Sequence, residues 1–477
     1  MAPSIASTEP PLKDLLSTPP PPVLKKPSPV PSATATTQRY QATAEKHITS
    51  AVGRLRNHVF ASGSGLQVQT TDGRQLLDFT SGIGVTSLGH AHPVVTAAIV
   101  EQASSIVHVQ CGIALSKPYV ELVEQLVTMM PSPTLDSFFL WSSGSEAIEA
   151  AIKLARTKTR RNNIIVMQGG YHGRTAGAAA LTRSKTSFFA GTGPLMPCVY
   201  TTAFPYWHAL GLPQDTPEEE LVRMAVHQLE QTLAQQSAPS DTAAIFVEPV
   251  IGEGGYVPAP PAFLRALRET CSKHGILLVV DEIQTGFGRT GANFAIEYAK
   301  DVVPDIMTFA KGFANGMPLS GVVTRKEIME CMPAGSLGGT YAGNAVACAA
   351  ALATTKYMVE MDVLGNVRRR GEQLAQGLRD IAADTQNGGS IIAEVRGTGL
   401  MLAVEFQSPS SSNPTLPANL NKLVQDECYD RNLLVLTTSI YPVLRLIPAL
   451  ILTEADVNVA LRVIKEAVKA VARKAGM

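Results

Sequence analysis

The sequence predicts an α/β protein with a large domain around a mostly parallel sheet and a smaller α+β domain. From about Pro93, helical stretches alternate with short β-rich runs, FFLW, NIIVM, AAIFVEP and ILLVVDE, which is typical of a parallel sheet covered by helices. After Tyr357 the pattern changes to a helix around GEQLAQGLRD, strands near IIAEVRGTGLMLAVEF and NLLVLTT, and a last helix from Glu454. At 477 residues the chain also exceeds what one hydrophobic core usually serves.

Four segments follow from this pattern. Residues 1–38 are rich in proline, which interrupts backbone hydrogen bonding, and are expected to form a disordered extension. Residues 39–92 combine a helix-compatible stretch with short strands that turn at Asp72-Gly73, and are assigned to the small domain. Residues 93–357 form the large domain, and residues 358–477 complete the small domain, which is thus built from both chain ends.

Charge and composition favour small-molecule partners. Lys plus Arg and Asp plus Glu both total 40, so the chain has no excess charge for nucleic acid or an anionic membrane. The six cysteines lack C-x-x-C spacing, which argues against a zinc site or a disulfide framework and favours a reducing compartment. No apolar run is long enough to span a membrane. The first stretch carries Glu9 and Asp14 and no arginine before Arg39, which favours the cytosol over the mitochondrion.

Two carboxylates end one strongly predicted strand. In GILLVVDEIQTGFGRTG, a continuous apolar run indicates a strand buried on both faces, and it ends at Asp281 and Glu282. Ligands of open α/β sheets bind at this end of the strands. A carboxylate there is suited to pair with the protonated nitrogen of a pyridine cofactor, and Asp281 is the natural candidate. Capping of a following helix is the competing interpretation.

A lysine follows another apolar strand. In DIMTFAKGFANGMPLSG, Lys311 stands between the strand and a glycine-rich turn, where its amine can reach the same crevice. Burial would lower the pKa of this amine and make it a nucleophile. Most lysines in loops are simply solvated charges. The apolar neighbours Met307, Phe309 and Phe313 favour the buried interpretation.

Two segments are candidate phosphate sites. WSSGSEAIEAAIKLARTKT begins with the capping-box pattern Ser143-x-x-Glu146, so a helix should open with Gly144 and Ser145 at its N-terminus. Backbone N–H groups and the helix dipole bind phosphate at such a position, although every capped helix has this feature. A glycine-rich loop ending at Thr340 is a second candidate.

Charged and aromatic residues in other loops are candidates for substrate contacts. QGGYHGRTAG follows the strand NIIVM and supplies Tyr171, which can stack on a ring, His172, and Arg174, which can hold a carboxylate. Glu253 in EPVIGEGG and Arg396 in RGTGLM carry opposite charges from the two domains. Their pairing is equally compatible with an ordinary interdomain salt bridge.

Together these segments resemble class III (ω-amino acid) aminotransferases of the fold-type I pyridoxal-phosphate superfamily, with 4-aminobutyrate aminotransferases the most similar group. The resemblance covers nearly everything from about residue 40. It rests on the ordered motifs DFTSGIGVTSLGHAHP, SSGSEAIEAAIKLAR, YHGRT, EPVIGEGG, VVDEIQTGFGRTG, FAKGFANGMPLSGV, GGTYAGN and RGTGLM. Trp141 and the segment YWHALG depart from the family pattern and are candidates for the border of the substrate channel.

The resemblance implies a role for each candidate around pyridoxal 5′-phosphate. Lys311 would bind the cofactor covalently and Asp281 would face its pyridine nitrogen. The other cofactor contacts would be Gln284 to the ring hydroxyl, Tyr171 and Ile283 on the two ring faces, His172 beside Asp281, Gly144 and Ser145 at the phosphate, and Thr340 from the neighbouring subunit of a homodimer. The substrate contacts would be Ile83, Arg174, Glu253 and Arg396, with Glu253 neutralising Arg396 while an ω-amino donor is bound.

The function implied is transfer of the amino group of an ω-amino acid to 2-oxoglutarate by a ping-pong exchange between pyridoxal and pyridoxamine phosphate. The favoured donor is 4-aminobutyrate. The alternatives are acetylornithine or ornithine as donor, an epimerase or decarboxylase on the same scaffold, and a cofactor-free structural homologue.

Overall fold

The computed structural model describes residues 33–409, 414–438 and 440–476. Most of the predicted N-terminal extension, residues 1–32, lies outside the described residues. The expectation of disorder up to residue 38 is wrong for its last part, because helix α2 begins at Ala33 and ends at His47. The last proline of the N-terminal segment is Pro31, so nothing in the sequence after it prevents a helix.

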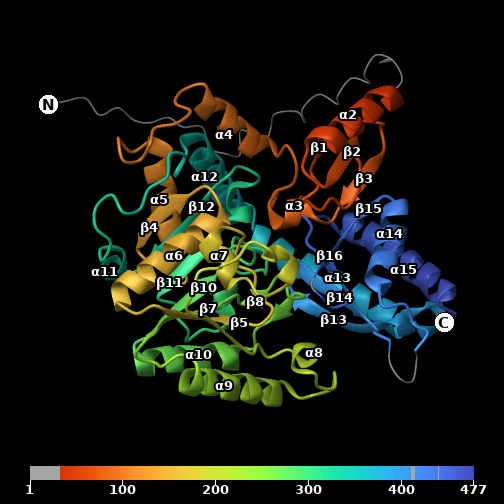
Figure 1. Ribbon diagram of the computed structural model, residues 1–477. Helices are drawn as coiled ribbons and strands as arrows, with labels where there is room; N and C mark the ends of the chain where they lie inside the picture. The colour runs from red at the N-terminus through yellow and green to blue at the C-terminus, as the bar shows by residue number, and fades with distance from the viewer. Residues whose placement is uncertain (1–32, 410–413, 439, 477) are drawn as a thin grey trace.

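A seven-stranded sheet forms the centre of the large domain (Figure 1). Its order is β4-β12-β11-β10-β7-β5-β6. Strands β11, β10, β7, β5 and β6 run parallel, whereas β12 is antiparallel to both of its neighbours. The predicted mostly parallel sheet is confirmed. The bounds are β4 Ser137–Trp141, β5 Asn163–Met167, β6 Val199–Thr202, β7 Thr242–Val247, β10 Leu277–Asp281, β11 Ile306–Phe309 and β12 Ser320–Thr324.

Helices cover both faces of this sheet, because alternate residues of its strands belong to two different apolar clusters. Ile165, Ile245 and Leu278 pack with α9 and α10, while the intervening residues of the same strands pack with α6 and α7. Helices α4, α5 and α12 pack together at one end of the domain. The bounds are α4 Pro93–Ala103, α5 Lys117–Met129, α6 Gly144–Thr159, α7 Ala176–Leu181, α8 Trp207–Leu210, α9 Glu218–Gln235, α10 Pro261–His274, α11 Lys326–Met329 and α12 Ala345–Glu360.

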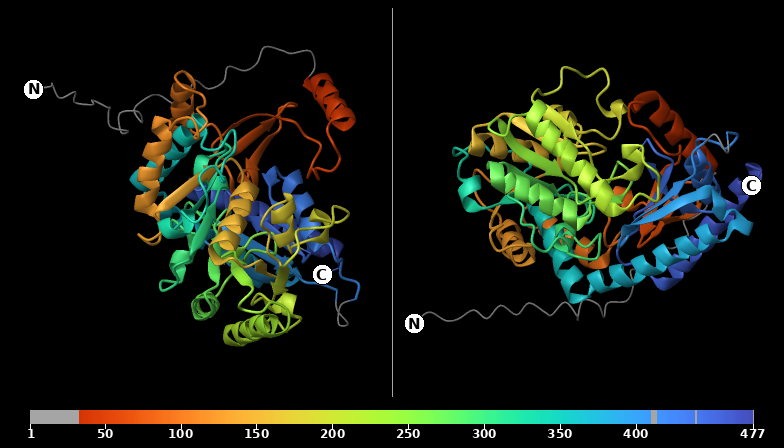
Figure 2. Two further views of the ribbon diagram at one scale, coloured as in Figure 1. Left: turned by 60° about the vertical axis from the view of Figure 1, so that its left-hand side comes forward. Right: turned by 90° about the horizontal axis from the view of Figure 1, so that it is seen from below.

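Both chain ends contribute to the second group of elements (Figure 2). The predicted hairpin forms between β2 and β3, and β3 pairs in parallel with β15 from the C-terminal part. A second sheet has the order β13-β14-β17-β16. The bounds are α3 Ser81–Gly84, β1 Phe60–Ser64, β2 Gln67–Thr70, β3 Gln75–Asp78, α13 Val363–Ala383, β13 Ile392–Thr398, β14 Met401–Phe406, α14 Leu420–Asp430, β15 Leu433–Leu434, β16 Leu436–Thr438, β17 Val443–Leu446 and α15 Glu454–Lys474. A short hairpin, β8 Val250–Ile251 with β9 Val257–Pro258, lies after β7.

Among the residues that the structure describes, no helix combines the length and apolar character needed to cross a membrane.

Candidate active site

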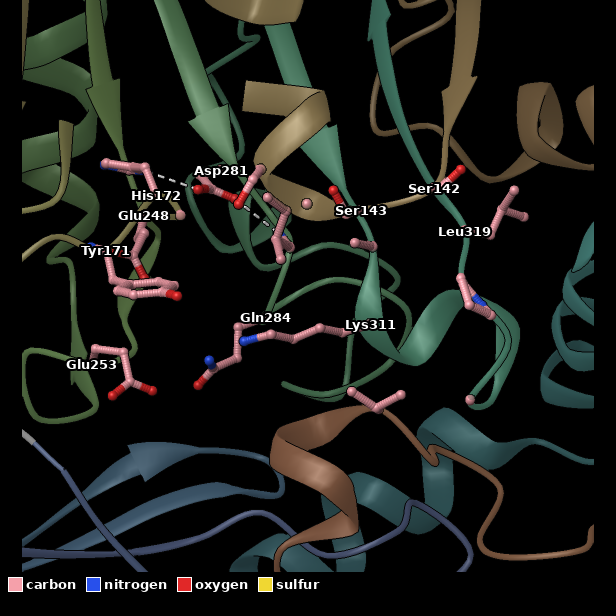
Figure 3. Close-up of a pocket in the computed structure, with 18 of the residues that line it drawn as sticks. Ser142, Ser143, Tyr171, His172, Glu248, Glu253, Asp281, Gln284, Lys311 and Leu319 are labelled. Atoms are coloured by element: carbon pink, nitrogen blue, oxygen red, sulfur yellow. Dashed lines mark hydrogen bonds and ion pairs between the residues drawn. The ribbon is translucent and has the colours of Figure 1, made fainter. Parts of the chain in front are cut away.

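A cavity of about 290 Å³ opens where the parallel strands β5, β7, β10 and β11 end (Figure 3). Its walls include nine residues singled out from the sequence. These are Gly144, Ser145, Tyr171, His172, Glu253, Asp281, Ile283, Gln284 and Lys311. Residues separated by up to 167 positions therefore meet in one crevice, at the sheet edge where α/β proteins bind their ligands.

Lys311 extends into this cavity from the segment after β11 (Figure 3). Desolvation lowers the pKa of its amine to about 8, and the positive charge of Arg445 acts in the same direction, against the carboxylate of Glu253. A substantial fraction of the amine is therefore neutral near pH 8 and able to act as a nucleophile or a base. The backbone of Lys311 has a φ of +50°, a left-handed conformation that costs a residue other than glycine about 1 kcal/mol or more.

Asp281 is buried at the end of β10 and is held by three donors. Its Oδ2 lies 2.7 Å from Nδ1 of His172, and its Oδ1 accepts bonds from the N–H of Ile283 at 3.0 Å and the hydroxyl of Thr308 at 3.1 Å. Residues 283–290 form turns and no helix begins directly after Asp281, so it does not cap a helix. These contacts fix a carboxylate at the wall of the cavity, as a partner for a cationic ring nitrogen requires.

A second buried carboxylate lies behind the first. Glu248 accepts bonds from the N–H groups of Tyr171 at 2.7 Å and Gly252 at 2.9 Å. Burial raises the pKa of Glu248 to about 7, although the nearby His172 opposes this shift. Burial would lower the pKa of His172, but the hydrogen bond to Asp281 and the negative charges of Asp281 and Glu248 together outweigh burial and raise it. The carboxylates around the imidazole therefore favour its protonated form.

The predicted N-terminus of α6 forms one end of the cavity. The capping box is confirmed, because the Ser143 N–H donates to Glu146 at 2.7 Å and the Glu146 N–H donates to the Ser143 hydroxyl at 3.4 Å. A Cβ on Gly144 would lie 3.0 Å from Ile283, so this end has no room for a side chain. A 16-residue helix pointing its N-terminus into a cavity is a suitable site for a phosphate.

The prediction that Glu253 pairs with Arg396 is wrong. Glu253 instead pairs with Arg445 at 2.5 Å and accepts a bond from the Thr438 hydroxyl at 2.9 Å. Burial would raise the pKa of Glu253, but Arg445 holds it at about 2. Arg396 pairs with Glu394 and Glu405.

The reason for this error is the register of the second sheet. Ala403 on β14 lies opposite Arg396 on β13 and opposite Arg445 on β17. The two arginines therefore occupy one row of the sheet, two strand spacings or about 10 Å apart. Sequence reasoning missed Arg445, although a charged residue within the apolar run VLRLIPALIL is a usable signal.

Four predicted residues do not line the cavity of their own chain, and Arg396, whose carboxylate partners are given above, is one of them. Thr340 is exposed, and its carbonyl oxygen accepts a bond from His108 at 2.6 Å. Arg174 is exposed, donates from Nε to the Tyr171 hydroxyl at 3.1 Å and lies 4.5 Å from the ring centre of Phe188. Ile83 is 40% exposed. Neither Trp141 nor the segment YWHALG, residues 206–211, reaches this cavity.

Comparison with known proteins identifies the family. The class III aminotransferase family matches residues 49–468, and the chain belongs to this family. A 5-aminovalerate aminotransferase of Pseudomonas putida is 38% identical, over 87% of this chain and 94% of the relative. A 4-aminobutyrate aminotransferase of Escherichia coli is 36% identical, over 88% and 95% respectively.

Solved structures of aminotransferases share the fold of this chain. A taurine:2-oxoglutarate aminotransferase from Bifidobacterium kashiwanohense, in complex with pyridoxal phosphate and glutamate, is 26% identical with a TM-score of 0.84, over 92% of this chain and 98% of that chain. An (S)-enantioselective ω-transaminase from Thermomicrobium roseum is 30% identical with a TM-score of 0.82, over 91% and 98%. This protein is a pyridoxal-phosphate-dependent aminotransferase with the type I fold.

The cavity fits this cofactor. Oε1 of Gln284 is buried and has no hydrogen-bond partner within the described part of the chain, so it can accept a bond from a ring hydroxyl. The N-terminus of α6 suits the phosphate, Asp281 the ring nitrogen, and the amine of Lys311 the aldehyde.

Proposed function

We propose that this enzyme transfers the amino group of an ω-amino acid, with 4-aminobutyrate as the favoured donor, to 2-oxoglutarate. The observation that carries the proposal is the buried ion pair between Arg445 and Glu253, a carboxylate that lines the cavity that holds Lys311. The relatives named for 4-aminobutyrate and 5-aminovalerate support the donor class.

The ion pair addresses the difference between the two substrates. An ω-amino acid has one carboxylate, far from its amine, whereas 2-oxoglutarate has a second carboxylate next to the carbon that receives the amino group. When the ω-amino donor is bound, Glu253 neutralises Arg445, which would otherwise be an unpaired buried cation. When 2-oxoglutarate binds, the Glu253 side chain leaves and Arg445 holds the second carboxylate. Arg174, at the exposed edge beside Tyr171, binds the distal carboxylate of either substrate.

The catalytic steps follow from the positions of the side chains. Bound pyridoxal phosphate supplies an aldehyde for the substrate amine and a cationic ring that withdraws electrons. Lys311 would hold the cofactor covalently, and its amine, once free, would carry a proton away from the substrate carbon. The carboxylate of Asp281 would face the ring nitrogen, and His172 fixes the orientation of this carboxylate. Tyr171 and Ile283 would hold the two faces of the ring.

A screen of donors tests this proposal. Initial rates are measured with 4-aminobutyrate, 5-aminovalerate, ornithine and N-acetylornithine, each with 2-oxoglutarate, and glutamate formation is recorded. We expect the highest kcat/KM with 4-aminobutyrate. Activity confined to the ornithines would overturn the donor assignment. Product formed in excess of enzyme from a donor without any acceptor would show an epimerase or decarboxylase instead.

Replacing Arg445 by methionine separates the two half-reactions. We expect kcat/KM for 2-oxoglutarate to fall about 100-fold, because the second carboxylate loses its charged hydrogen-bond partner. The half-reaction with 4-aminobutyrate should change much less, since it does not use Arg445 for binding. Single-turnover absorbance changes measure each half separately. Arg223→Met on the exposed face of α9 is the matched control, and equal losses in both halves would contradict the assignment.

We also propose a homodimer whose active sites are completed by Thr340 of the second subunit. The segment from α4 to α5 exposes apolar side chains, and Tyr341, next to Thr340, contacts His108 of this segment with ring centres 5.8 Å apart. An exposed apolar surface of this kind is typical of a protein interface. The exposed residues are Val100, Ile106, Val107, Ile113, Leu115 and Tyr341.

Ile113→Asp tests the dimer. Ile113 is 82% exposed in the single chain, so a charge there should leave the fold intact but place an unpaired carboxylate in the interface. We expect the variant to sediment as a monomer and to lose most activity. Val459→Asp on α15 is the control for an exposed apolar residue elsewhere, and an unchanged dimer in Ile113→Asp would reject this surface.

A further inference from the structure

Arg396 has all its hydrogen-bond donors engaged within the protein. Its Nη1 pairs with Glu394 at 2.9 Å and with Glu405 at 2.5 Å. Its Nε and Nη2 both donate to the carbonyl oxygen of Gly255, at 3.1 and 2.7 Å, and Nη2 lies 3.3 Å from the Tyr206 hydroxyl. A guanidinium has five N–H groups, and these five contacts use them all. Arg396 therefore has no donor left for a substrate carboxylate.

The partners of Arg396 are themselves held by the segment YWHALG. The hydroxyl of Tyr206 and Nδ1 of His208 bind the two oxygens of Glu405, and Trp207 donates to Glu394 at 2.9 Å. The ring of Tyr206 also lies 5.0 Å from the guanidinium carbon of Arg396. This segment thus joins the large domain to β13 and β14 around one buried cation.

The carbonyl that Arg396 binds belongs to the loop that carries Glu253. Gly255 lies two residues after Glu253, between β8 and β9. It has a φ of +126°, and a Cβ there would meet Nη2 of Arg396 at 3.2 Å. At the preceding residue, Gly254, a Cβ would meet the carbonyl oxygen of Gly169 at 2.5 Å. The loop is therefore packed on one side and bound by Arg396 on the other.

We propose that Arg396 is a positioning residue for the specificity of the active site. By fixing the Gly255 carbonyl it holds the 252–256 loop at the place where the Glu253 side chain reaches Arg445, and Glu405 with the YWHALG segment holds Arg396. Glu253 can then leave and rejoin Arg445 by side-chain rotation on a fixed backbone. This inference rests on the proposed exchange of Glu253 for a substrate carboxylate at Arg445.

Arg396→Met tests this role, because methionine keeps an unbranched apolar stem but cannot bind the Gly255 carbonyl. The first measurement is the ratio of kcat/KM for 4-aminobutyrate to kcat/KM for glutamate, which has a carboxylate on the reacting carbon. We expect this ratio to fall about tenfold, since a misplaced Glu253 no longer masks Arg445 for the one-carboxylate donor. The second measurement is the affinity for glutarate, an unreactive dicarboxylate, by calorimetry. We expect Arg396→Met to bind glutarate at least as tightly as the parent enzyme, whereas Arg445→Met binds it at least tenfold more weakly.

Two outcomes overturn the proposal. Glutarate binding weakened as much in Arg396→Met as in Arg445→Met would make Arg396 a substrate ligand. An unchanged donor ratio with a lowered Tm would make it a structural residue only.

Glu394→Gln is a milder variant, because it removes one partner of Arg396 and keeps the Gly255 bonds, so it should change the ratio by less. If Arg396→Met does not fold, Arg396→Lys should shift the ratio in the same direction. Failure of the parent enzyme with every ω-amino donor would reject the proposed function, and glutarate binding would still test Arg396.

Discussion

Replacing Lys311 by alanine should lower kcat at least about 10⁴-fold, the largest loss expected of any single substitution in this enzyme. Among the described residues that line the cavity, Lys311 carries the one primary amine, and burial lowers the pKa of that amine to about 8. In the proposed mechanism, alanine removes both the group that would bind the cofactor covalently and the base that would move the proton. Single-turnover kinetics with 4-aminobutyrate measure the loss.

Chemical rescue provides the control for Lys311. Small primary amines such as methylamine fit into the space left by the lysine side chain and should restore part of the proton transfer, which a misfolded protein would not show. Lys300 is exposed, and Lys300→Ala should leave kcat within about twofold, as is usual for a surface side chain. A Lys311→Ala variant with more than a small percentage of the parent rate would refute the assignment.

Patterns within short sequence segments predicted much of the fold and the cofactor-binding wall of the site. Apolar runs of five or six residues gave the strands that end at Asp281 and before Lys311, and the capping-box pattern gave the first residue of α6. Each of these depends on a short segment whose burial and hydrogen bonding are visible in its own sequence. The parallel arrangement then brings the strand ends together without further information.

The arrangement of the substrate-binding residues depends on contacts between segments that are distant in the sequence. Whether Arg396 or Arg445 faces Glu253 is decided by the register of β13, β14 and β17, in which both arginines share a row with Ala403. The sequence also does not show that Glu394 and Glu405 already occupy Arg396. The role proposed for Thr340 would require a second chain, and in a single chain this residue is exposed outside the cavity.

Asp281→Asn should lower kcat about 10³-fold while the protein stays folded. Asparagine keeps the shape of the side chain but removes the negative charge that stabilises a positive ring nitrogen in the electron-withdrawing state. It also removes the hydrogen bond between charged groups that raises the pKa of His172, so the imidazole loses its proton more easily. Cofactor affinity should fall, and the absorbance of the bound cofactor should shift towards that of its neutral ring.

The neighbouring carboxylate is the matched control for Asp281. Glu282 is also buried, but its side chain accepts bonds from Thr285 and from the N–H of Ile296 at 2.8 Å and does not line the cavity. Burial raises the pKa of Glu282 to about 7, so this group is only partly ionised at neutral pH. Because Glu282 does not line the cavity, Glu282→Gln should leave kcat nearly unchanged. If both substitutions lowered kcat equally, the loss would come from packing at the end of β10. If only Asp281→Asn does so, the charge facing the ring is the cause.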